Sequence, residues 1–200
     1  MTSPDVHLGA APDGATTDAD APARRWRDPR RPFWALALLV PLLPFLARDL
    51  VDWTGWSGFW WIGPVLIFGL MPLLDQALGL DRLNPPEAAT AELDADRFYR
   101  RLTYAYLPLQ FASLIWACSV WASGELSTFA ALGLAATVGC VAGIAINTAH
   151  ELGHKHPTLE RWLAKVALAQ SGYGHFYVEH NRGHHQRVST PEDPASSRLG

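Results

Sequence analysis

Long apolar stretches alternate with short polar connections along most of this chain. Four of the stretches are apolar enough for membrane helices, which need about 20 residues to cross the hydrocarbon core. The predicted spans are residues 33–52, 58–80, 102–123 and 126–149. Pro41 and Pro44 fall inside the first span and predict a kink there. We expect an all-α integral membrane protein, because a chain of 200 residues has too little polar surface to cover four such helices.

The segments outside the spans have three different patterns. Residues 1–32 are rich in Ala, Asp, Pro and Thr, which predicts a disordered tail. Residues 158–172 carry apolar side chains at helical spacing, with Glu160 and the basic residues placed elsewhere. This pattern predicts an amphipathic helix that lies at the membrane interface or re-enters the bilayer. A histidine-rich segment, residues 179–185, follows it.

Basic residues are unevenly distributed among the polar connections. Five arginines lie in ARRWRDPRRP before the first span, and four lie in the connection 81–101. RDLVDWTGWS, at the end of the first span and in the connection after it, and GE before the fourth span together hold one arginine and three acidic residues. Because basic residues favour the cytoplasmic side of the lipid bilayer, the N-terminus and the end of the fourth span are predicted to face the cytoplasm. The net charge of −3, with no basic run interleaved with aromatics, excludes a typical nucleic-acid partner.

Small residues and cysteines within the spans predict packing rather than chemistry. Gly139 and Gly143 form a GxxxG pair in the uncharged fourth span, which predicts close approach of another helix. Cys118 and Cys140 both lie in apolar segments. We expect them to be small buried side chains, because free cysteine is among the most buried residue types.

Seven of the eight histidines fall between residues 150 and 185, directly after the fourth span. His150 and His154 are spaced i and i+4, so they share one face of a helix. His180 and His184 repeat this spacing, and His185 is adjacent to them. Two helical turns that present paired imidazoles can converge on metal, and such donors suit zinc, copper, iron or nickel.

Three interpretations of this cluster remain open from the residues alone. His-Glu-x-x-His is the motif of zinc proteases, in which Glu151 would be the general base. Five imidazoles exceed what one tetrahedral zinc ion with an open position can use, so two redox metals and oxygen chemistry on a lipophilic substrate are favoured. A non-catalytic membrane scaffold would bind no metal.

Several motifs resemble one known family. HELGHK at 150–155 and EHNRGHH at 179–185 resemble the first two histidine boxes of the membrane-bound alkane 1-monooxygenases, which are related to xylene monooxygenases and membrane fatty-acid desaturases. The resemblance extends to MPLLDQALG, LNPPE, RFYRRLTY, GYGHFYVEHNRGHH and TPEDPASSRLG, and thus covers about residues 50–200. The family carries a further histidine box that is absent before Gly200. We therefore expect the N-terminal portion of a longer enzyme.

The resemblance implies O₂-dependent hydroxylation of the terminal methyl of alkanes at a non-haem di-iron centre. Electrons would come from NADH through rubredoxin reductase and rubredoxin, at the cytoplasmic face of a bacterial inner membrane. The implied iron ligands are His150, His154, His180, His184 and His185. This set is incomplete for two iron ions, so the chain alone is expected to be inactive. Two alternatives to an alkane hydroxylase remain. A membrane fatty-acyl desaturase or hydroxylase would share the di-iron chemistry, whereas an intramembrane zinc protease would catalyse a different class of reaction.

Carboxylates near the histidines are candidates to support the metal site. Metal-bound imidazoles usually donate their other ring N–H to a carboxylate or carbonyl. His156 and His175 are not part of the i, i+4 pairs and are candidates to support the metal ligands. The candidate carboxylates are Glu151, Glu179, Asp193 and Asp75.

The second span is the candidate wall of a channel that brings alkane from the bilayer to iron. Its candidate residues are Trp60, Trp61, Ile67 and Phe68, although ordinary packing or lipid contact is an equal alternative. In the family that the chain resembles, bulk midway along this helix limits the length of the alkane. Ile67 lies at about that depth and is not an aromatic plug, so we expect medium to long alkanes to be accepted.

Overall fold

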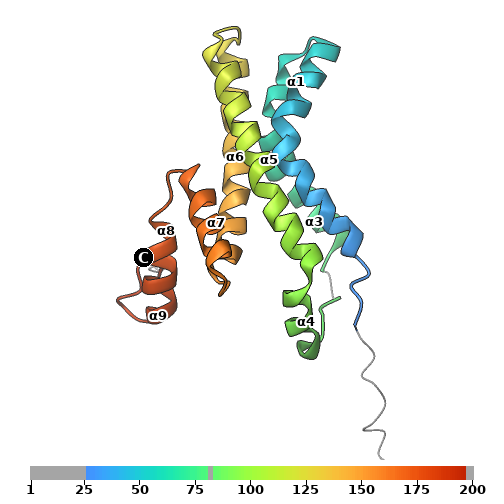
Figure 1. The fold of residues 1–200 in the computed structure, drawn as a ribbon. Coiled ribbons are helices and arrows are strands. Elements are labelled where there is room, and N and C mark those ends of the chain that lie inside the picture. The colour runs from blue at the N-terminus through green and yellow to red at the C-terminus, as the bar shows by residue number, and fades with distance from the viewer. Residues whose placement is uncertain (1–25, 81–82, 197–200) are drawn as a thin grey trace, which may run out of the picture.

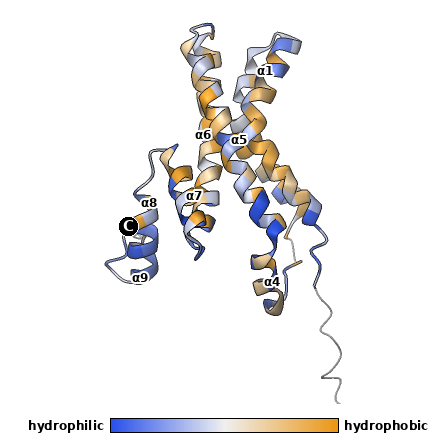
Figure 2. Ribbon diagram, in the orientation of Figure 1, coloured by the Kyte–Doolittle hydropathy of each residue, from blue (hydrophilic) through white to orange (hydrophobic). Residues whose placement is uncertain are grey.

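The computed structural model describes residues 26–80 and 83–196, in which every regular element is helical (Figure 1). Four helical stretches are long and apolar enough to cross a membrane, and Figure 2 shows their hydrophobic middles. They are Arg31–Thr54, Ser57–Leu78, Arg97–Ala122 and Thr128–Gly153. The predicted all-α membrane architecture is confirmed. Most of the tail predicted to be disordered, residues 1–32, lies outside the described residues.

The first stretch changes its helical geometry at its prolines. A 3₁₀-helix, η2 (Arg31–Leu42), leads directly into α1 (Leu43–Thr54). Pro41 lies inside η2 and Pro44 lies in the first turn of α1, and both rings are buried. Proline lacks the N–H that an α-helical hydrogen bond needs, which accounts for the change of geometry at this point.

The second stretch is irregular along most of its length. It consists of η3 (Ser57–Trp61), α2 (Ile62–Pro64), a π-helical segment η4 (Val65–Leu70) and α3 (Met71–Leu78). The π-helical segment lies between two prolines, Pro64 and Pro72, each of which removes a backbone donor.

Helix α6 (Thr128–Gly153) meets the second stretch at Gly63. The Gly63 N–H donates to Thr137 Oγ1 at 3.0 Å, and that hydroxyl donates to the Trp60 carbonyl at 2.7 Å. A Cβ at Gly63 would lie 2.7 Å from Thr137 Cα, so only glycine allows this approach. The predicted close contact at Gly139 and Gly143 is wrong, because no described atom lies within 4 Å of a Cβ built at either glycine.

The last two spans have well-defined starts. Asp96 caps α5 (Arg97–Ala122) by accepting from the Phe98 N–H, and Ser127 caps α6 by accepting from the Ala130 N–H. Helix α5 begins five residues before the predicted residue 102. Helix α6 continues past residue 149 to Gly153, so the first histidine pair belongs to its C-terminal end.

Helix α7 (Thr158–Ala169) runs back along the end of α6 (Figure 1). Its small residues Ala164 and Ala167, with Leu168, pack against Ala149 and Leu152 of α6. The larger apolar side chains of α7 face outward, and these are Leu159, Trp162 and Val166. The larger apolar side chains thus face away from α6, and the small ones face it because they allow the closer helix contact. Three short elements follow, α8 (Phe176–Val178), η6 (Glu179–His184) and α9 (His185–Arg187).

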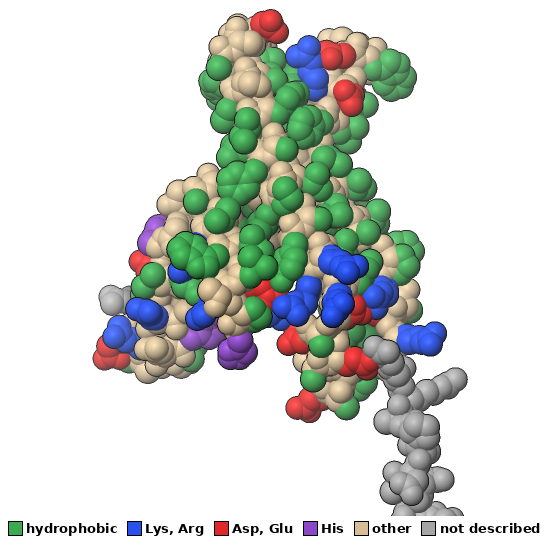
Figure 3. All heavy atoms as spheres, viewed as in Figure 1, with side chains coloured by type: hydrophobic (Ala, Val, Ile, Leu, Met, Phe, Trp, Pro, Cys, Tyr) green, Lys and Arg blue, Asp and Glu red, His purple; other side chains and the backbone are tan. Residues whose placement is uncertain are grey.

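Most of the charged side chains in this view, and the histidines, lie at one end of the molecule (Figure 3). Ion pairs join the chain segments there: Arg31 pairs with Asp96, Arg100 with Glu160 at 2.8 Å, and Lys155 with Asp94 at 2.7 Å. The start of the first span, the short helix α4 (Thr90–Ala95), the start of α5 and the end of α6 therefore share this end. This arrangement is the one that the distribution of arginines predicts.

Candidate metal centre

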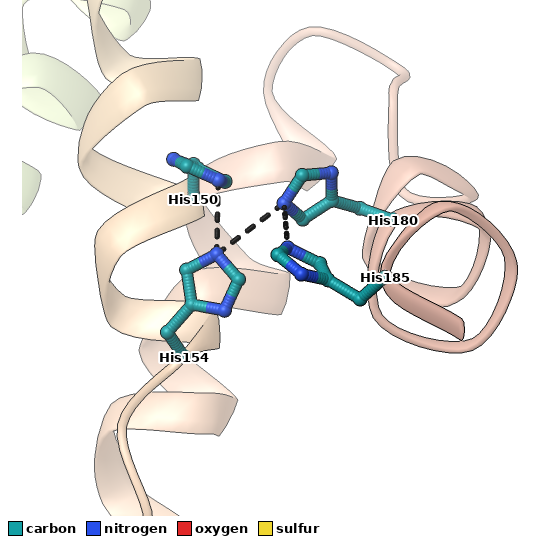
Figure 4. Close-up of side chains that lie close together, drawn as sticks. All are labelled: His150, His154, His180 and His185. Carbon is teal, nitrogen blue, oxygen red and sulfur yellow. Dashed lines mark hydrogen bonds between the residues drawn. The ribbon is translucent and has the colours of Figure 1, made fainter. Parts of the chain in front are cut away.

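Four histidine side chains from two parts of the chain converge at the end of α6 (Figure 4). His150 comes from the last turn of α6 and His154 is the residue that follows this helix, whereas His180 and His185 come from η6 and α9. The Nε2 atoms lie 2.9 Å apart for His150 and His154, 3.3 Å apart for His154 and His180, and 2.9 Å apart for His180 and His185. One ring nitrogen from each side chain lies within 4.8 Å of the other three.

The local helical geometry decides which histidines converge. In α6, the i, i+4 spacing brings His150 and His154 together, as predicted. The second cluster lies on the π-helical turn η6, whose hydrogen bonds join residues i and i+5. This turn places His185, and not His184, beside His180. Four of the five predicted ligands are thus brought together, and His184 lies outside the group.

His184 is held by a buried carboxylate. Its Nδ1 lies 2.9 Å and 3.0 Å from the two carboxylate oxygens of Asp193, one of which also accepts from the Ala195 N–H. The hydrogen bond from His184 keeps the pKa of Asp193 below its usual value. An Nδ1–H that donates to Asp193 leaves the lone pair of His184 on Nε2. The ring of His184 stacks 5.6 Å from that of His180.

The distances among the four Nε2 atoms fit a bound cation better than hydrogen bonds. Nε2 of His154 and Nε2 of His180 each lie within 3.3 Å of two other nitrogens. A ring nitrogen carries either one proton or one lone pair, so neither can make two ordinary hydrogen bonds. Metal–imidazole bonds are about 2.0–2.1 Å, which places neighbouring ligand nitrogens about 3.0–3.4 Å apart. The donor set therefore fits a metal ion.

The surroundings of the cluster lower the pKa of two of its imidazoles, those of His154 and His180. Burial and the neighbouring histidines lower the pKa of His180 to about 4. Burial, followed by the neighbouring His150 and His185, also lowers the pKa of His154. Metal ligation requires the neutral imidazole, so both side chains have the protonation state that a metal needs at neutral pH.

The other predicted supporting residues lie outside the cluster. Glu151 is 69% exposed, and its Oε1 lies 3.5 Å from His150 Nδ1. Glu179 lies 4.0 Å from the exposed His175, which is not one of the four converging histidines. Asp75 is exposed on α3, and His156 is exposed after α6. Of the predicted carboxylates, only Asp193 forms a close, buried contact with a histidine of this region.

The predicted channel residues fall into two groups. Trp60 is 2% exposed in the core between helices, and Trp61 donates to the Phe129 carbonyl at 3.2 Å. Ile67 and Phe68 instead line a groove of about 410 Å³ between η4 and α6. The α6 side of the groove ends at Asn147, one turn before His150. Its α6 residues are Ala136, Gly139, Cys140, Gly143, Ile144 and Asn147.

Glu160 is a buried polar residue of α7 whose burial was not predicted from the sequence. It is 1% exposed and accepts from Arg100 Nε at 2.9 Å and from the Tyr104 hydroxyl at 2.6 Å. Burial raises the pKa of Glu160, but these two hydrogen bonds outweigh burial and leave the pKa below its usual value. Its i, i+4, i+7 spacing to Ala164 and Ala167 was the signal in the sequence for this buried position.

Comparison with known proteins finds relatives over most of the chain. Residues 127–200 match the fatty acid desaturase family. The chain is 46% identical to alkane 1-monooxygenase 1 of Alcanivorax borkumensis over 91% of its own length and 45% of that protein. It is 44% identical to the alkane 1-monooxygenase of Pseudomonas putida over 89% of its length and 44% of that protein.

The chain thus spans less than half the length of these curated relatives. Both histidine clusters lie within the residues that match the fatty acid desaturase family. The likeness of the chain to the relatives covers nearly all of its own sequence. We conclude that the chain is homologous to part of the alkane 1-monooxygenases and that its residues 127–200 match the fatty acid desaturase family.

Proposed function

We propose that this chain forms part of a membrane enzyme that hydroxylates the terminal methyl of alkanes with O₂ at a non-haem di-iron centre. The observation that carries the proposal is the convergence of four imidazoles at the end of a candidate membrane helix. The relatives named alkane 1-monooxygenase share this part of the sequence.

His150, His154, His180 and His185 would hold one iron ion, since one ring nitrogen from each side chain lies within 4.8 Å of the other three. His184 would serve the second iron, because Asp193 fixes its tautomer and leaves Nε2 free to ligate. When bound, iron supplies the redox chemistry that attack on an unactivated C–H bond needs and that zinc lacks.

The groove beside Ile67 is the proposed path of the alkane. Its α6 residues from Ala136 to Ile144 are apolar or glycine, and its last residue, Asn147, lies one turn before His150. An alkane is most concentrated in the bilayer, so a groove among membrane helices delivers it to the histidines without passage through water. Ile67 and Phe68 remain the proposed walls, and Trp60 and Trp61 would support them through helix packing.

The proposed electron source is NADH, through rubredoxin reductase and rubredoxin, on the cytoplasmic side of a bacterial inner membrane. The histidines share one end of the molecule with the arginines around the first and third spans (Figure 3). Basic residues favour the cytoplasmic side, where a soluble electron-transfer protein would reach the metal.

A fatty-acyl desaturase or hydroxylase is the second candidate, favoured by the match of residues 127–200 to the fatty acid desaturase family. It would use the same metal site with a different substrate. A zinc protease is disfavoured, because four converging imidazoles leave a tetrahedral zinc ion no open position. Glu151, its would-be general base, is largely exposed.

The decisive experiment joins this chain to the part of the A. borkumensis relative that it does not cover. We expect this chimera to convert dodecane to 1-dodecanol in cells that lack their own alkane hydroxylase and contain rubredoxin. The His150→Ala chimera should be inactive while His156→Ala, a nearby exposed histidine, retains activity. Desaturated or hydroxylated acyl chains without 1-dodecanol would favour the second candidate instead.

A further inference from the structure

A second pocket lies within the membrane-spanning part of the molecule, between α5, α6 and the end of α7. Its volume is about 430 Å³, within the range of about 300–1,000 Å³ that is usual for small-molecule sites. Gln110 and Ser113 contribute from α5, and Gln170 contributes from the residue after α7. The other lining side chains are apolar or glycine, apart from the Cys118 thiol, and no charged side chain lines the pocket.

The three polar side chains of this pocket have buried atoms without partners. Gln110 is 2% exposed and Ser113 is 1% exposed. Among the described residues, Gln110 Oε1, Ser113 Oγ and both amide atoms of Gln170 are buried and have no hydrogen-bond partner. A buried polar atom without a partner costs free energy, and more so among membrane helices, where little water can reach it.

We propose that this pocket binds an apolar molecule that carries a single hydroxyl group, of which a medium-chain primary alcohol is the simplest example. A hydroxyl can donate to Gln110 Oε1 and accept from Ser113 or the Gln170 amide, so it partners these atoms. The alkyl chain would lie along Leu114, Leu134 and Val138.

The same features exclude neighbouring classes of ligand. An alkane would leave the polar atoms unpartnered, which favours the alcohol over the hydrocarbon of equal length. A carboxylate or phosphate would be buried without a cation, because no basic side chain lines the pocket. The class of ligand that remains is an apolar molecule with one hydroxyl group.

This inference goes beyond the proposed alkane hydroxylation and does not depend on it. The groove proposed for the alkane and the pocket share Gly139 of α6, but the groove is otherwise closed by Ile67 and Phe68 of the second stretch and the pocket by α5 and Gln170. None of the histidines lines the pocket. Loss of hydroxylase activity would therefore leave alcohol binding intact, and each proposal can fail alone.

A native cysteine provides the probe. Cys118 lines the pocket and is exposed, contrary to the expectation that it is buried, whereas Cys140 lines the groove beside Ile67. We would label the Cys140→Ala chain at Cys118 with a trifluoroethyl thiol reagent in lipid nanodiscs. Titration with 1-dodecanol should give a saturable change of the ¹⁹F shift, and dodecane should give no saturable change. The Cys118→Ala chain labelled at Cys140 is the control for general partitioning into the bilayer.

Matched serine variants complete the test. Ser113→Ala combined with Gln110→Met should weaken the apparent affinity for 1-dodecanol about tenfold, the effect of losing two hydrogen bonds. Ser119 lies on the same helix, and its hydroxyl donates to the Trp116 carbonyl. Ser119→Ala should leave the affinity for 1-dodecanol unchanged. Equal responses to dodecane and 1-dodecanol, or equal affinity in the double variant, would overturn the proposal. A ¹⁹F shift that follows the protein-to-lipid ratio instead of the alcohol would assign the pocket to a second copy of the chain.

Discussion

Nε2 of His154 lies 3.3 Å from Nε2 of His180, although 26 residues separate the two histidines. The contact joins the end of α6 to the π-helical turn η6, and α7 connects them. Since α7 runs back along α6, its packing against Ala149 and Leu152 controls whether the two histidine clusters meet. The metal site is therefore a property of the helix packing as much as of the histidine motifs.

The first prediction concerns the number of metal ions that the 200-residue chain binds. One ring nitrogen from each of four histidines lies within 4.8 Å of the other three, so we expect one Fe(II) ion per chain under anaerobic conditions, measured by elemental analysis of the purified protein. His180→Ala should abolish stoichiometric binding, because His180 contacts both His154 and His185. His175→Ala is the matched control. Two tightly bound irons per chain would contradict the prediction.

Asp193→Asn tests the role of the carboxylate behind His184. An amide cannot hold the His184 ring as the carboxylate does, so we expect the active chimera to lose about 10–100-fold in activity. Iron at the four-histidine site should be retained, because His184 is outside that group. Glu192→Gln, an exposed neighbour, is the control and should have no effect. Unchanged activity in Asp193→Asn would contradict the proposal that His184 binds the second iron.

Glu160 makes the stability of the protein depend on pH. Because its folded pKa lies below the usual 4.5, the charged form stabilises the fold above pH 4.5, and this contribution is lost as the pH falls through the folded value. We expect Glu160→Gln to lose about 1–3 kcal/mol at neutral pH. Thermal unfolding in detergent should show that the wild type loses more stability on acidification than this variant. Parallel pH profiles for both, with exposed Glu125→Gln as control, would disprove the assignment.

Ile67 should set the longest alkane that the groove accepts. Ile67→Trp in the active chimera is expected to shift the product distribution towards shorter alcohols, because the indole would fill part of the groove beside Gly139 and Gly143. Val65→Trp, on an exposed position of the same helical segment outside the groove, should leave the distribution unchanged. Competition among alkanes of increasing length, analysed by gas chromatography, measures the effect. An unaltered profile in Ile67→Trp would rule out this path.

Gly63 should be indispensable for the packing of the second stretch on α6. The methyl of Gly63→Ala would lie 2.7 Å from Thr137 Cα, so the helices must separate, and we expect a loss of about 1–3 kcal/mol of stability. Gly69→Ala has no described atom within 4 Å of its new Cβ and is the matched control. Equal unfolding midpoints for the two variants would contradict the close contact at Gly63.

The apolar runs predicted the four candidate spans, because a membrane helix is defined by local length and composition. The GxxxG pair shows the limit of local patterns. Gly139 and Gly143 have the motif but line a groove, whereas the close contact occurs at Gly63. Which small residue meets another helix depends on the rotation and crossing of both helices, and one segment's sequence does not contain this information.

The sequence alone determined that histidines would cluster at one end of a membrane helix, since His150 and His154 follow an apolar run at a spacing that any α-helix brings together. Only the tertiary structure decided that His185, and not His184, joins them, because η6 is π-helical and changes which side chains share a face. It also decided that Glu160 is buried against Arg100 and Tyr104. Both outcomes depend on contacts between segments distant in sequence, which local spacing does not specify.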